Sequence, residues 1–122
     1  MNNTARVVAF IAAILAFSAL ILAAMGSHLV EMKGMQHIWQ TASNIHLFSA
    51  AALVGLAGLL AILESLLLRW GTWLIVLGTV IFCCSIYLRV ITGYSVQNLT
   101  PAGGLLMMVG WVLAALAFLR KS

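Results

Sequence analysis

Hydrophobic and polar positions along this chain are grouped in blocks the length of a helix: four long apolar runs are separated by three short polar links. A run of about 20 apolar residues can cross the hydrocarbon core of a bilayer as a helix. The pattern predicts membrane-spanning helices at approximately residues 7–25, 42–68, 70–91 and 101–119. Because the links are short, consecutive helices are expected to be antiparallel neighbours. The predicted fold is an all-α membrane protein, a four-transmembrane-helix antiparallel bundle in a single domain, 1–122.

The first apolar run also resembles the core of a secretory signal peptide. Arg6 precedes it, and small residues surround Met25 near its end. The run extends over about 19 residues, however, which is long for such a core. We therefore expect a permanent helix here and no cleavage.

Composition strengthens the membrane assignment. Hydrophobic residues make up 65% of the chain and charged residues 7%, against about 45–50% and about 25% in soluble domains. The net charge is +4, but the six basic residues are scattered near the expected helix ends. This scattering favours contact with the lipid bilayer and no binding of nucleic acid.

The basic residues also predict an orientation, because basic residues are enriched in cytoplasmic loops. Four spans place both termini on the same side of the membrane. Four basic residues belong to that side: Arg6, Arg69, Arg120 and Lys121. Two belong to the other side: Lys33 and Arg89. We expect a bacterial inner (plasma) membrane protein with both termini in the cytoplasm.

Small residues recur at helical spacing in the first, second and fourth spans. Such residues allow close approach of another helix in lipid, where dispersion replaces the missing hydrophobic drive. Ala19 and Ala23 extend an alanine face on the first span. The residues expected at helix interfaces are Ala12, Ala16, Gly55, Gly58, Gly103, Gly104, Gly110 and Trp111.

Polar side chains gather at the predicted non-cytoplasmic ends of the helices. The candidate set for a ligand site in this outer half is His28, His46, Ser49, Tyr87, Arg89 and Thr100. In one interpretation His46 and Tyr87 bond within the protein and lock the bundle. In another, the set binds a lipid headgroup or small amphipathic ligand, with Arg89 contacting an anion. In a third, His28 and His46, with Cys83 as a further candidate, bind copper or zinc, which imidazole and thiolate both suit.

Catalysis is the weaker hypothesis. The chain has no aspartate, and its only acidic residues, Glu31 and Glu64, are expected on opposite sides of the membrane. No arrangement of a nucleophile, a base and an acid can be assembled from them. We therefore expect no enzyme activity and name no catalytic residue.

The third and fourth spans contain the motifs that point to a family. Gly78-Thr79 is followed by Ile81-Phe82-Cys83-Cys84-Ser85-Ile86-Tyr87, Thr92-Gly93, Thr100-Pro101-Ala102-Gly103-Gly104 and Gly110-Trp111. Together with Gly26-Ser27-His28 and with Thr41-Ala42 before His46, these resemble the YgdD/YwdK family of small membrane proteins, domain of unknown function 423. The resemblance covers almost the whole chain.

The resemblance implies a fold and a membrane location and no established activity. Members of the family usually carry a second histidine where this chain has Ser49. This departure favours a structural or ligand-binding role for His46 over a histidine-pair metal site.

The function expected first is that of a non-enzymatic accessory or structural subunit of a larger membrane complex, with other membrane protein subunits or further copies of the chain as partners. Binding or transport of a lipid or small amphipathic ligand, or metal handling, remains the alternative. The sequence identifies no cofactor.

Overall fold

The computed structural model describes residues 2–28, 36–93 and 99–119, without the side chains of residues 27 and 28. It contains helices α1 (Asn3–His28), α2 (Gln36–Ile62), α3 (Leu66–Thr92) and α4 (Leu99–Leu119). All four are long and apolar enough to cross a membrane. The predicted all-α bundle of four transmembrane helices is confirmed.

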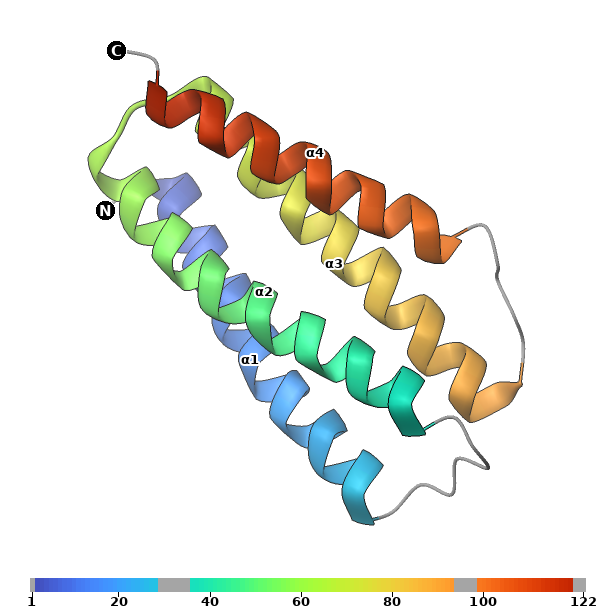
Figure 1. Cartoon of the computed structure of the whole chain (residues 1–122). Coiled ribbons are helices and arrows are strands. Elements are labelled where there is room, and N and C mark those ends of the chain that lie inside the picture. The colour runs from blue at the N-terminus through green and yellow to red at the C-terminus, as the bar shows by residue number, and fades with distance from the viewer. Residues whose placement is uncertain (1, 29–35, 94–98, 120–122) are drawn as a thin grey trace.

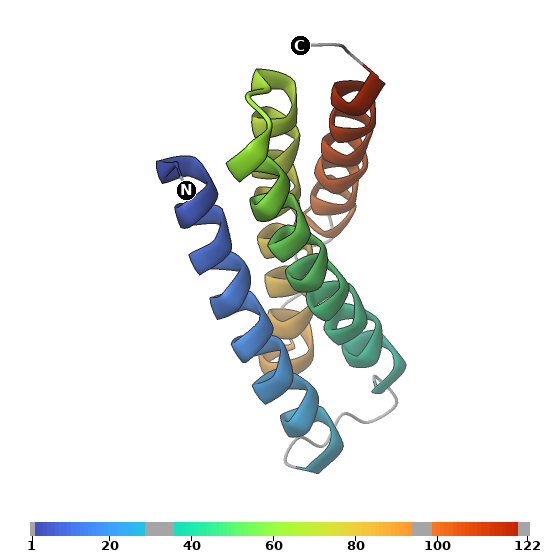
Figure 2. The same cartoon turned by 90° about the vertical axis from the view of Figure 1, so that its left-hand side faces the viewer.

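The helices follow chain order across the bundle (Figure 1). α1 packs along α2, α2 along α3, and α3 along α4, each pair antiparallel. α1 and α4 therefore form the two edges of the molecule, on opposite sides of the α2–α3 pair (Figure 2). We call the end where α1 begins and α4 ends the terminal end, and the other the opposite end.

The link between α2 and α3 lies earlier than expected. The sequence predicted a second helix reaching residue 68 and a third beginning at residue 70, but α2 ends at Ile62 and α3 begins at Leu66. Ser65 causes the difference: its backbone is extended, and its hydroxyl accepts the Leu68 amide at 3.1 Å. A serine N-cap of this kind satisfies an amide left free at a helix start.

Asn2 connects two helices at the terminal end. Its side-chain oxygen accepts the Ala5 amide at 2.8 Å and so caps the start of α1. Its side-chain nitrogen donates to the Leu60 carbonyl at 2.8 Å, near the end of α2. Both contacts satisfy backbone groups that the ends of helices leave without partners.

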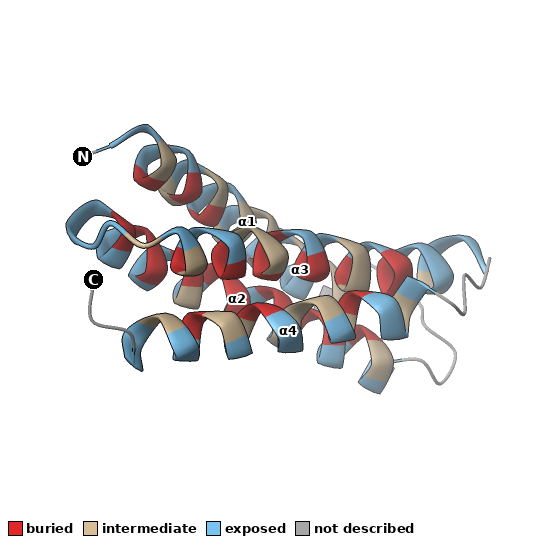
Figure 3. Ribbon diagram, turned by 90° about the horizontal axis from the view of Figure 1, so that it is seen from above, coloured by how far each residue is buried: buried red, intermediate tan, exposed pale blue. Residues whose placement is uncertain are grey.

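The buried side chains face the neighbouring helices, and the large apolar side chains outside them face the lipid (Figure 3). One apolar cluster at the terminal half draws on all four helices, with Leu53, Leu68 and Ile75 fully buried in it. A second, at the opposite half, surrounds Trp39 and Tyr87.

Glycines bring the backbones of α3 and α4 close together. A Cβ added to Gly71 would lie 2.7 Å from the Gly110 carbonyl oxygen, and one added to Gly78 would lie 2.6 Å from that of Gly103. Real Cβ atoms essentially never come within 3.0 Å of a non-bonded heavy atom of another part of the chain. The two backbones are therefore in direct contact, with dispersion between them.

Two of the glycines expected to pack do not contact another helix in the part of the chain that the structure describes. Gly55 and Gly58 lie on the exposed side of α2, where an added Cβ would meet nothing within 4 Å. Gly104 would make only an ordinary contact, 3.9 Å from the Phe82 ring. Spacing alone identifies a small-residue face without showing which way it points.

The other residues expected at interfaces are distributed between core and periphery. Ala12 is fully buried and Ala16 half-buried on α1. Trp111 is half-buried against the first apolar cluster, with its ring 6.3 Å from that of Phe48. Trp111 thus joins α4 to α2 through side chains.

Candidate functional site

A hydrogen-bonded cluster centred on His46 joins α1, α2 and α3. The His46 side chain is 5% exposed. Its Nε2 lies 3.1 Å from the Ser18 hydroxyl on α1, and its Nδ1 lies 3.1 Å from the Tyr87 hydroxyl on α3. Both ring nitrogens of one histidine are thus engaged, and one side chain holds three helices together.

The surrounding groups determine which ring nitrogen carries the proton. The Ser18 hydroxyl donates its hydrogen to the Leu15 carbonyl at 3.0 Å, so Nε2–H of His46 must donate to Ser18. A neutral imidazole has one N–H and one acceptor. Nδ1 therefore accepts from Tyr87, and every contact in the chain from Leu15 to Tyr87 has one donor and one acceptor.

The Tyr87 hydroxyl has a second neighbour. It also donates to Ser43 Oγ at 3.4 Å, so its single hydrogen is shared between Ser43 and the closer His46 Nδ1. Its ring packs on Trp39, with centroids 4.7 Å apart. Tyr87 is held at both ends, by an aromatic contact and by hydroxyl contacts to α2.

Trp39, a tryptophan near a predicted helix end, is in the core. It is 2% exposed, and its indole N–H donates to the Leu22 carbonyl at 2.9 Å. That carbonyl belongs to the last turns of α1. Trp39 thus ties the second apolar cluster to α1.

The structure brings together only part of the predicted ligand set. His46 and Tyr87 are in contact, whereas Thr100 lies 2.6 Å from Ser85 and Ser49 donates to the Met107 sulfur at 3.9 Å. Arg89 is exposed on the last turn of α3. The side chain of His28 lies outside the described residues. The predicted set is therefore divided between an α1–α2–α3 cluster and contacts that bind α4.

Ser18 and Ser43 belong to the cluster and were missed. Ser18 lies in an otherwise apolar helix, and the chain offers no sequence signal for the direction in which it points. Ser43 is three residues before His46, a spacing that places both on one helix face. That spacing could have identified Ser43.

The described side chains do not assemble a metal site. No three of their histidine, cysteine, aspartate and glutamate residues gather as a metal ion would require. The Cys83 thiol instead donates to the Ala42 carbonyl at 3.5 Å, and both nitrogens of His46 have protein partners.

A small cavity lies beside the cluster at the opposite end. Its volume is about 250 Å³, and it lies between the last turns of α1 and the first turns of α2. The buried Trp39 and Ser43 line it, together with Gln36, Gln40 and Asn44. Ser43 therefore contacts both this cavity and the Tyr87 hydroxyl.

Comparison with known proteins places the chain in a family. Residues 22–104 match the family model described as a protein of unknown function (DUF423). The chain is 31% identical to a UPF0382 membrane protein of Staphylococcus aureus over 98 residues, 77% of this chain and 80% of that protein. It is 30% identical to the UPF0382 inner membrane protein YgdD of Escherichia coli K12 over 121 residues, 96% of this chain and 92% of that protein.

No solved structure matches the chain. The family match covers more than half of the residues and includes Ser43, His46 and Tyr87 of the cluster, but not Ser18. It also includes the α3 glycines and Gly103. The resemblance read from the motifs of the third and fourth spans is confirmed. The chain belongs to the DUF423 (UPF0382) family of small membrane proteins.

Proposed function

We propose that this protein is a non-enzymatic accessory or structural subunit of a larger membrane complex. The observation that carries the proposal is the exposed position of Gly55 and Gly58 on α2. Glycine weakens a helix interior by up to about 1 kcal/mol relative to alanine. In a membrane, that cost is offset where another helix approaches closely.

The contrast with α3 and α4 supports this interpretation. There, Gly71, Gly78, Gly103 and Gly110 face another backbone within the same chain. Gly55 and Gly58 also lie near each other on one side of a helix, but a Cβ added to either would meet nothing within 4 Å. We infer that a transmembrane helix of a partner protein fills this space.

The His46 cluster supports a structural role for the interior. Its polar groups bond to one another across three helices. Among the described residues, no buried side-chain nitrogen or oxygen lacks a partner. In this proposal the cluster fixes the helix positions, and recognition takes place on the outer surface.

Native mass spectrometry after mild detergent extraction from the original membrane tests the proposal. The expected result is co-elution with larger membrane proteins, which is lost in Gly55→Leu. Ala115→Leu, on the exposed side of α4, is the matched control and retains the association. Elution of the wild type only as a monomer or homo-oligomer would contradict an accessory role.

A second candidate is binding of a small amphipathic or lipid ligand at the opposite end. The cavity of about 250 Å³ beside Trp39 and Ser43 favours it. The same experiment addresses this candidate: a retained ligand mass that disappears in Gln40→Leu would support it, and equal retention by both proteins would contradict it.

A further inference from the structure

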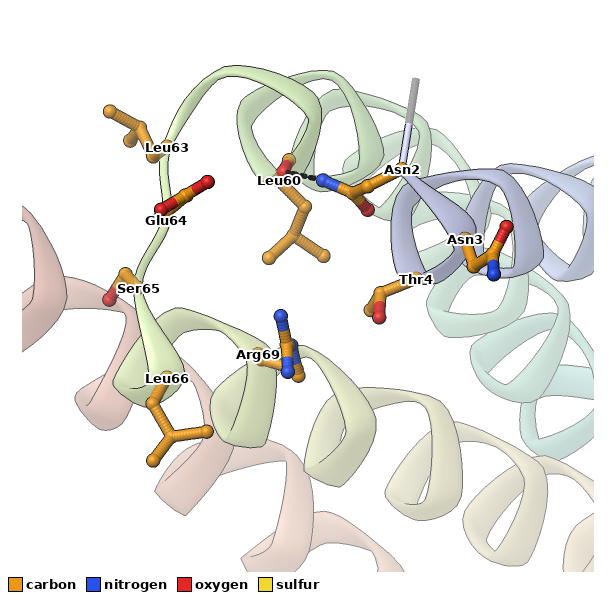
Figure 4. Close-up of a pocket in the computed structure, with 9 residues that line it drawn as sticks. All are labelled: Asn2, Asn3, Thr4, Leu60, Leu63, Glu64, Ser65, Leu66 and Arg69. Carbon is orange, nitrogen blue, oxygen red and sulfur yellow. Dashed lines mark hydrogen bonds between the residues drawn. The ribbon is translucent and has the colours of Figure 1, made fainter.

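A larger cavity lies at the terminal end, away from the His46 cluster. Its volume is about 330 Å³, and it is an open cavity lined by the start of α1, the end of α2 and the start of α3 (Figure 4). This is near the lower end of the range of about 300–1,000 Å³ for small-molecule pockets. Its polar lining includes Asn3, Thr4, Glu64 and Arg69.

Two opposite charges face this cavity without pairing to each other. Figure 4 shows the Arg69 side chain reaching into the space between α1 and the α2–α3 link, and Glu64 on that link. No ion pair joins these two described residues. A ligand that carries both an anion and a cation would contact each of them.

The cavity lies at the depth of lipid headgroups. The apolar spans of α1 and α3 begin beside it, and that of α2 ends beside it. Leu66, at its edge, is 65% exposed, and Ile62 nearby is 78% exposed. Trp70 is 61% exposed one residue beyond Arg69, as expected for a tryptophan at a membrane interface.

The helix ends around the cavity favour the anionic part of such a ligand. α1 and α3 both begin there and α2 ends there, so two helix N-termini face the cavity against one C-terminus, and neither N-terminus has an acidic residue in its first turn. The N-terminal ends of helices carry partial positive charge. This potential adds to the full charge of the Arg69 guanidinium on the same wall.

We propose that this cavity binds the headgroup of a zwitterionic phospholipid with a primary ammonium, a phosphoethanolamine. The phosphate accepts hydrogen bonds from Arg69 and Thr4. The ammonium donates to the carboxylate of Glu64 and the amide oxygen of Asn3. The acyl chains lie against Leu66 and the neighbouring apolar side chains. The site is separate from Gly55 and Gly58, so it stands or fails independently of the accessory-subunit role.

The experiment measures lipid retention by the full chain in detergent by native mass spectrometry. The probes are phosphatidylethanolamine, phosphatidylcholine and phosphatidylglycerol with identical acyl chains. The wild type should retain phosphatidylethanolamine most. Arg69→Gln should lower retention of all three about fivefold, the effect of one basic residue near a membrane surface. Glu64→Gln should lower phosphatidylethanolamine retention to the level of phosphatidylcholine.

Arg89→Gln is the matched control, because Arg89 is an exposed arginine on the same helix at the opposite end. It should leave retention unchanged, and all three variants should keep the wild-type melting temperature, since these side chains are exposed. Equal loss in Arg69→Gln and Arg89→Gln, or preference for phosphatidylglycerol, would overturn the proposal. So would displacement of the lipid by an equal concentration of soluble phosphoethanolamine, which would identify a water-soluble ligand.

Discussion

At the scale of single residues, the hydrogen bonds that neighbouring hydroxyl groups make determine the tautomer of His46. Because the Ser18 hydroxyl donates to the Leu15 carbonyl, the imidazole has to donate to Ser18 and accept from Tyr87. One tautomer fits the site. A side chain that cannot both donate and accept at these positions would leave a buried polar group unpaired, which is costly in a low-dielectric interior.

Replacing His46 with alanine should therefore destabilise the bundle. The change removes two interhelical hydrogen bonds, each worth about 0.6 kcal/mol on average in membrane proteins, and leaves a cavity. We expect a loss of about 2 kcal/mol in the free energy of unfolding. Unfolding in mixed detergent micelles, followed by circular dichroism, measures it.

His37→Ala is the control for this experiment. His37 is exposed on the first turn of α2, so its replacement should leave the unfolding free energy unchanged. Similar losses in the two variants would show that the His46 contacts do not hold the bundle together.

The sequence predicted this cluster in part. His46 and Tyr87 stand out as polar residues in apolar spans, and their common depth follows from the antiparallel arrangement. Ser18 could not be found, because a single serine on an apolar helix gives no rotational reference. Arg89 and Thr100 share that depth with His46, yet they point elsewhere, since depth does not determine the direction of a side chain.

At the scale of helices, glycines spaced seven residues apart bring the backbones of α3 and α4 into direct contact. Gly71 and Gly78 on α3 face Gly110 and Gly103 on α4. Seven residues are close to two helical turns, so each pair lies on one face. The equal interval on α3 and α4 could have indicated that these glycines pack together. Paired glycines alone do not show this, because Gly55 and Gly58 are also paired on one helix and lie on its exposed side.

Gly78→Ala should separate α3 from α4. The added methyl group would lie 2.6 Å from the Gly103 carbonyl oxygen, which is backbone and has no rotamer to change. We expect a loss of about 1–3 kcal/mol in unfolding free energy, the usual effect of overpacking. Thermal melting of the purified protein in detergent measures the change.

Gly58→Ala provides the comparison, since open space surrounds that position. Its melting temperature should equal or exceed that of the wild type. If both alanine variants melt alike, the backbone contact between α3 and α4 is not a determinant of stability.

The boundary between α2 and α3 shows why helix ends were harder to predict than helices. Leucines lie on both sides of Glu64 and Ser65, so hydropathy does not change sharply there. The predicted break between the second and third spans, at residue 69, lies within the first two turns of α3. The capping hydroxyl of Ser65 was the relevant local signal.

At the scale of the whole molecule, the two ends differ in charge and in shape. Arg6 and Arg69 lie at the terminal end, where Arg69 lines the larger cavity, and Arg89 lies at the opposite end. Lys33, Arg120 and Lys121 fall outside the described residues. The predicted orientation therefore continues to rest on the count of basic residues in the sequence.

Reporter fusions test that orientation. A green fluorescent protein fused to the C-terminus should fluoresce, and alkaline phosphatase fused there should be inactive, because the positive-inside rule places this end in the cytoplasm. Alkaline phosphatase inserted after Lys33 should be active. Active phosphatase at the C-terminus would reverse the orientation.

The direct backbone contact of α3 with α4 also affects how the protein sits in bilayers of different thickness. The 27 residues of α3 extend about 40 Å, beyond a hydrocarbon core of about 30 Å. A helix that is too long for the core tilts, and α4, joined to α3 along its length, has to tilt with it. α1 lies on the far edge of the molecule and packs mainly on α2. When the bilayer thins or thickens, the angle between the α3–α4 pair and α1 should change. The shape of the molecule would then depend on the thickness of the membrane.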